Sequence, residues 1–150
     1  TPIVSSPSVP QPCAYMWAYR DMPEISAELQ AAVRAILPEA EARASAYGEN
    51  CVAADGSATF TAMETDFYLR IPIADLNEKA ALGNLIGRLL PIILDQFPRE
   101  RLPGPKDGFV EFTFFLGENQ RVVRAPIPLG RELREKGLTG VELLQALESP

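Results

Sequence analysis

Carboxylates and an aromatic side chain alternate in one segment of this 150-residue chain, METDFYLRI from Met63 to Ile71. In an extended strand Glu64, Asp66 and Tyr68 lie on one face, because successive side chains point to opposite faces. Glu111 lies in a later segment in which apolar and polar residues alternate. It lies on the same face as Glu64, Asp66 and Tyr68 if its strand is a neighbour of theirs. Such a carboxylate cluster has the chemistry to hold calcium through several oxygens, or to act as an acid–base pair in hydrolysis.

The same residues also fit non-catalytic interpretations. They fit a solvated sheet face on which Arg70, Arg121 and Arg124 act as counter-ions. They equally fit an outward ligand-binding surface made of Glu64, Asp66, Tyr68 and Glu111, on which Phe60 and Phe115 add aromatic area. The remaining alternative is that a helix covers these aromatic rings.

Residue types that enzymes use most are scarce in this chain. It contains no histidine, which is the commonest general base and a common metal ligand. It has no G-x-S-x-G motif, phosphate loop, dinucleotide fingerprint or Asp-x-Asp-x-Asp-Gly calcium loop. We therefore expect no cofactor and no metal, and a binding or structural module rather than an enzyme. The alternative is a hydrolase or metal-dependent enzyme that uses the carboxylate cluster.

The two cysteines, Cys13 and Cys51, allow one intramolecular pair. A disulfide between them favours an extracytoplasmic protein, whereas two reduced thiols would indicate a cytosolic one. Residues 1–12 hold four prolines and three serines, which predicts a flexible linker ahead of a single domain over 13–150. We thus expect a secreted, periplasmic or surface-anchored location.

Charge and hydropathy narrow the range of partners. The formal net charge is −6, which disfavours nucleic acid and anionic lipid as ligands. No apolar run is long enough for a transmembrane helix. A protein, peptide or glycan ligand remains, and the sequence does not determine the oligomeric state.

Helical and extended patterns alternate along the chain. Apolar spacing predicts a helix over 23–46, kinked or split at Pro38, and a second over 77–97. Residues 51–73 read as β structure with a turn at Asp55–Gly56. A hairpin follows over 109–127, then a short helix at 131–136 and a last helix that begins after Thr139.

These elements predict an α+β fold. We expect an antiparallel sheet of three to four strands, with helices packed mainly on one face and the order α-β-α-β-β-α. The aromatic cluster from Tyr15 to Tyr19 is expected to plug the domain, with a carbohydrate-stacking surface as the alternative.

Three short segments resemble uncharacterised bacterial exported or lipid-anchored proteins. They are YGENC at Tyr47–Cys51, ADG at Ala54–Gly56 and METDFYLRI at Met63–Ile71. The resemblance implies an exported location and no motif-defined activity.

Overall fold

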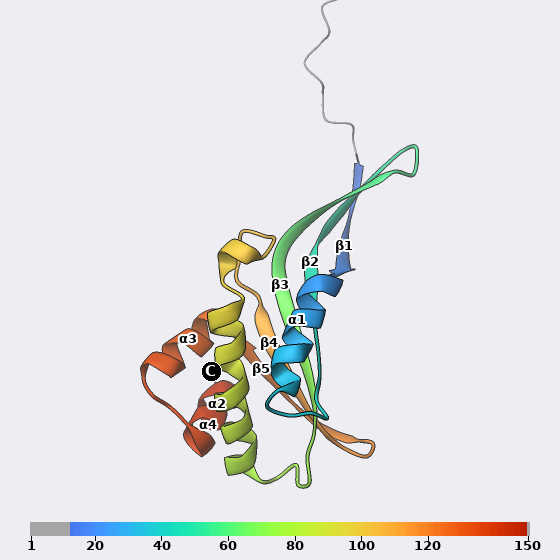
Figure 1. Cartoon of the computed structure of the whole chain (residues 1–150). Coiled ribbons are helices and arrows are strands. Elements are labelled where there is room, and N and C mark those ends of the chain that lie inside the picture. The colour runs from blue at the N-terminus through green and yellow to red at the C-terminus, as the bar shows by residue number, and fades with distance from the viewer. Residues whose placement is uncertain (1–12, 150) are drawn as a thin grey trace, which may run out of the picture.

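The computed structural model describes residues 13–149 as a sheet with helices packed against it (Figure 1). The predicted linker over 1–12 lies outside the described residues. The elements in chain order are β1 (Cys13–Asp21), α1 (Pro23–Arg34), β2 (Glu41–Ala53), β3 (Ala58–Pro72), α2 (Lys79–Gln96), a short 3₁₀ helix (Arg99–Arg101), β4 (Phe109–Leu116), β5 (Asn119–Pro126), α3 (Ile127–Glu135) and α4 (Gly140–Glu148).

The five strands form one sheet in the order β1-β2-β3-β4-β5. Neighbouring strands are antiparallel except β3 and β4, which run parallel. The parallel pair arises because α2 carries the chain back along the sheet before β4 begins (Figure 1). The fold is α+β, but the expected antiparallel sheet of three to four strands with the order α-β-α-β-β-α is wrong.

The main local difference concerns the segment after α1. The helix predicted over 23–46 ends at Arg34, and residues 41–53 form β2 instead. Ala42, Ala44 and Ala46 of β2 are buried at strand spacing, where small side chains let α1 pack closely on the sheet. Pairing with β1 and β3 on both sides overrides the high helix propensity of alanine.

The helices contribute to one hydrophobic core on one face of the sheet (Figure 1). From the sheet, the largest fully buried side chains are Phe67, Leu69, Ile71, Phe112 and Phe114. They meet fully buried residues of the helices, among them Leu29, Val33, Leu82, Ile86, Leu89, Ile93 and Leu144. Within residues 13–149 the opposite face carries no helix, and we call it the open face.

A register shift divides β3 into two parts. Tyr47 of β2 lies opposite Glu64, whereas the next residue, Gly48, lies opposite Ala62, so Met63 is an extra residue. The bulge reverses the alternation of side chains along β3. Phe60 therefore lies on the face opposite to that of Tyr68, and the prediction that the two share one face is wrong.

The two cysteines pair as predicted. Cys13 and Cys51 form a disulfide between β1 and β2 with a Cα–Cα distance of 5.2 Å, and residues 13–149 contain no free cysteine. No helix among these residues is long and apolar enough to cross a bilayer.

Candidate binding surface

The structure places Glu64, Asp66, Tyr68 and Glu111 on or beside the open face. Asp66 and Tyr68 follow the bulge in β3, and Tyr68 lies beside Glu111 in the parallel pairing of β3 with β4. Glu64 lies two residues before Asp66 on β3, opposite Tyr47 of β2. The four residues thus occupy one continuous stretch of the sheet, although their chemical environments differ.

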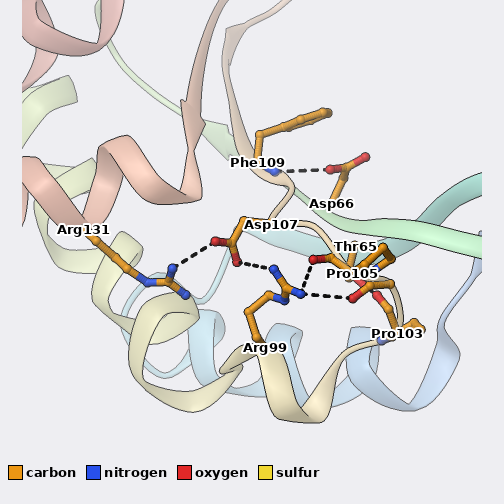
Figure 2. Close-up of polar contacts among 9 residues, drawn as sticks. Thr65, Asp66, Arg99, Pro103, Pro105, Asp107, Phe109 and Arg131 are labelled. Carbon is orange, nitrogen blue, oxygen red and sulfur yellow. Dashed lines mark hydrogen bonds and ion pairs between the residues drawn. The ribbon is translucent and has the colours of Figure 1, made fainter.

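Asp66 is the buried member of this group. Its side chain is only 2% exposed, and it accepts a hydrogen bond from the backbone N–H of Phe109 at 3.2 Å (Figure 2). Burial, together with the hydrogen bond to Glu64 and the negative charge of that neighbour, raises the pKa of Asp66 from 3.8 to about 8. The Phe109 N–H and Arg124 act in the opposite direction but do not cancel this effect. Asp66 therefore carries a proton at neutral pH and is shielded from a ligand.

Gly108 explains how Asp66 is covered. A Cβ on Gly108 would overlap both the Asp66 carboxylate and the Thr65 carbonyl, so only glycine lets the chain pass this close to β3. Phe109 follows directly and forms an edge-on contact with Tyr68 at 5.8 Å between ring centroids. The start of β4 thus covers the carboxyl group and orients the Tyr68 ring.

The loop before β4 is fastened to β3 by polar contacts (Figure 2). Thr65 Oγ1 donates to the Pro103 carbonyl at 3.2 Å, and the Lys106 N–H donates to the Met63 carbonyl at 3.0 Å. Asp107 lies between two arginines, with N–O distances of 3.7 Å to Arg99 and 3.1 Å to Arg131. These contacts determine where β4 starts and therefore where Phe109 lies.

Arg99 reinforces the same loop from its other side. Its guanidinium donates hydrogen bonds to the backbone carbonyls of Gly104 and Pro105 (Figure 2). The guanidinium therefore holds backbone carbonyls as well as the Asp107 carboxylate, and its planar shape suits this arrangement. The loop is consequently held at several points, which favours a preformed surface.

Arg43 and Arg70 are cations of the open face that form no ion pair within residues 13–149, although Glu41 lies opposite Arg70 in the pairing of β2 with β3. The Arg43 guanidinium stacks on the Tyr68 ring at 4.1 Å, and that of Arg70 stacks on Phe115 at 4.7 Å. Stacking holds each planar group in place and leaves its N–H donors available for an anion.

An open pocket of about 370 Å³ lies around these arginines. It is located where β2 extends past the end of β1, so the outer edge of residues 41–44 is not paired with β1. Its lining comes from α1 and three strands: Gln30, Arg34, Glu41, Ala42, Arg43, Tyr68, Arg70, Glu111 and Thr113. Of the four predicted site residues, Tyr68 and Glu111 line the pocket, whereas Glu64 and Asp66 do not.

Glu111 adds little net charge to the pocket. Its carboxylate accepts a hydrogen bond from Arg124 at 2.8 Å, and Arg124 also stacks on Phe109 at 4.0 Å. Arg121, by contrast, does not lie near this cluster as a counter-ion, because it pairs with Glu148 of α4 at 2.6 Å. The lining holds three arginines (Arg34, Arg43 and Arg70) against two glutamates (Glu41 and Glu111), so the pocket is locally basic although the chain as a whole carries a charge of −6.

The aromatic residues of β1 continue the open face toward the edge of the sheet. Tyr15, Trp17 and Tyr19 are 70%, 62% and 67% exposed, so the prediction that they plug the domain is wrong. Tyr47 of β2 contacts two of these rings, with centroid distances of 5.4 Å to Trp17 and 5.0 Å to Tyr19. They form an exposed aromatic row beside the basic pocket.

Among residues 13–149, no three His, Cys, Asp or Glu side chains are grouped so that they could hold a metal ion. The carboxyl group with the raised pKa is buried, and the accessible Glu111 is ion-paired. The described residues thus form a basic, aromatic pocket, and the buried Asp66 carboxyl does not line it.

Comparison of the chain with protein-family models, curated proteins and solved structures found no match. The site is therefore interpreted from its own geometry. Sequence analysis missed Arg43 because the helix predicted over 23–46 includes it. The available signal was the alternation of small and polar residues in EARASAY, Glu41 to Tyr47, which also suits a strand that is buried on one face.

Proposed function

We propose that this chain is an extracytoplasmic, non-catalytic binding module that holds an acidic segment of a protein partner. The observation that carries the proposal is the pair of stacked arginines in an open pocket, Arg43 and Arg70, neither of which forms an ion pair within residues 13–149. Guanidinium groups recognise carboxylates through paired N–H donors. A ring on which the guanidinium stacks keeps these donors in a fixed orientation for the carboxylate.

The composition around the pocket supports a protein ligand. Tyrosine, tryptophan and arginine dominate the energetically important positions of protein interfaces. The open face presents these residue types together, from Trp17 and Tyr19 on β1 to Arg70 on β3. An acidic peptide would place carboxylates on the arginines and lay its remaining length over the aromatic row.

The Cys13–Cys51 disulfide supports the extracytoplasmic location. Stable structural disulfides form mainly in oxidising compartments, and every cysteine of the chain takes part in this one.

The test is binding of a fluorescein-labelled oligoglutamate peptide, followed by fluorescence anisotropy at low salt. We expect saturable binding that weakens as salt is added, since the attraction is electrostatic. Arg43→Gln with Arg70→Gln should weaken binding at least about tenfold, which is roughly 1.4 kcal/mol. An oligoglutamine peptide should not bind.

Arg20 provides a matched control. It also stacks on an aromatic ring, Phe60 at 4.6 Å, and forms no ion pair within residues 13–149, but the register places it on the face opposite to the pocket. Arg20→Gln should leave binding unchanged. Equal loss in Arg20→Gln, or no binding by the wild-type chain, would refute the proposal. Mass spectrometry of the recovered peptide tests the non-catalytic part, because cleaved peptide would favour the hydrolase alternative.

A further inference from the structure

Among the residues that the structure describes, none pairs with the outer edge of β1. β1 pairs with β2 along its whole length, from Cys13 opposite Ala53 to Asp21 opposite Ser45, without a register shift. It is also the first strand of the sheet, so within residues 13–149 no strand pairs with its other edge. α1 packs on β2 instead of running along this edge. A regular edge of this kind presents a row of free N–H and C=O groups.

The other edge strand, β5, carries residues that hinder pairing with a further strand. β5 carries Arg121, Arg124 and Pro126, and charges and proline are the usual means by which edge strands avoid pairing. Residues 13–19 of β1 contain no charge, no proline and no bulge. β1 therefore lacks the features that protect the other edge.

The sequence of β1 allows the strand to pair with a second copy of itself. We propose that β1 pairs with β1 of a second copy of this chain, antiparallel, about a twofold axis at Trp17. In that register Trp17 lies opposite Trp17 of the second copy, and Tyr15 lies opposite Tyr19. All nine residues of β1 overlap, because Trp17 is the middle residue of the strand. Cross-strand aromatic pairs of this type stabilise antiparallel sheets.

The charge pattern of β1 is compatible with a second copy as the occupant. Two chains of net charge −6 repel each other over most of their surface, but residues 13–19 of β1 are uncharged, so contact at this edge adds no further repulsion. The charged residues of β1, Arg20 and Asp21, lie opposite Ala14 and Cys13 of the second copy, and no like charges meet. The same edge serves both copies, so the interface closes at two chains and does not extend into a fibre.

The twofold axis also determines the relative orientation of the two open faces. An axis perpendicular to the sheet turns the same face of both copies toward the same side. The two Arg43 pockets would then lie on one side of a continuous sheet, which gives a bivalent surface. The pairing is independent of what the pocket binds, so failure of the peptide experiment leaves it standing.

The first test is sedimentation velocity of the full chain over a range of concentrations. We expect a monomer–dimer equilibrium with no larger species. Trp17→Lys places a charge at the axis and should weaken the dimer at least about tenfold. Val122→Lys is the control, because Val122 is 46% exposed on the other edge strand and should leave the dimer unchanged. A wild-type chain that stays monomeric, or that grows beyond a dimer, overturns the proposal.

Cross-linking of variants with one added cysteine tests the register. It also tests the dimer itself if Trp17→Lys fails to fold. Residues directly opposite each other have Cα atoms about 5 Å apart, within reach of a disulfide. Trp17→Cys should therefore form a covalent dimer under mild oxidation. Tyr19→Cys should not, because its two copies lie about four strand positions apart, roughly 13 Å. Peptide mapping confirms that Cys13 and Cys51 remain paired. Equal cross-linking of both variants, or of neither, overturns the register.

Discussion

The buried Asp66 carboxyl makes stability depend on pH in a defined direction. Its pKa is about 8 in the folded chain against an ordinary value of 3.8. Between these values the folded protein holds a proton that the unfolded chain releases. Folding is therefore favoured most at low pH, and the contribution of Asp66 is lost as pH rises toward 8.

The size of the effect follows from proton linkage. One proton bound only in the folded state changes the free energy of unfolding by at most about 1.4 kcal/mol per pH unit. From about pH 5 to about pH 7, we expect Asp66 to remove about 2 kcal/mol. That is a measurable part of the roughly 5–15 kcal/mol that stabilises a typical domain.

The assay is urea unfolding, followed by circular dichroism at several pH values, for the wild type and Asp66→Asn. Asparagine keeps an acceptor for the Phe109 N–H and cannot ionise. Subtracting the unfolding free energies of the two proteins removes the contributions of the other titrating groups. The wild type should lose stability relative to Asp66→Asn as pH rises.

Asp55→Asn is the control. Hydrogen bonds from the Ser57 side chain and backbone lower the pKa of Asp55 in its exposed turn, so its contribution changes only at acid pH. The difference between the wild type and Asp55→Asn should be flat over the neutral range. Parallel pH profiles for the wild type and Asp66→Asn would refute the argument that Asp66 is protonated in the folded state.

Two further predictions concern packing and the disulfide. Gly83→Ala should destabilise the fold by about 2 kcal/mol or more, because the added Cβ would overlap the Gly140 carbonyl. Gly87→Ala, measured in the same thermal melts, should be neutral or stabilising by up to about 1 kcal/mol, since its Cβ would lie 3.7 Å from Leu143. Replacing Cys13 and Cys51 by alanine should cost about 2–4 kcal/mol in urea unfolding, and an unchanged midpoint would contradict the role given to the bond.

The parts of the fold that sequence analysis predicted share strong local signals. The alternation over Met63–Ile71 identified β3, the turn at Gly117 identified the β4–β5 hairpin, and a broad apolar stripe identified α2. The Cys13–Cys51 disulfide followed from the cysteine count. Each of these signals lies within one segment or in one pair of residues.

The parts that were missed depend on contacts between distant segments. β2 is rich in alanine, and only its neighbours β1 and β3 make it a strand. Local patterns do not determine the parallel pairing of β3 with β4 or the bulge at Met63 either. The Arg43 pocket was missed with β2, and the role of Glu64, Asp66, Tyr68 and Glu111 in ligand binding stays a prediction.

The position of the disulfide has a mechanical consequence. An edge strand pulled from its first residue peels away one pair at a time, which needs little force. Here that first residue, Cys13, is bonded covalently to β2. A tensile load applied at Cys13 passes directly into β2, which is paired on both sides, by β1 and by β3. The bond therefore prevents β1 from peeling away from its first residue.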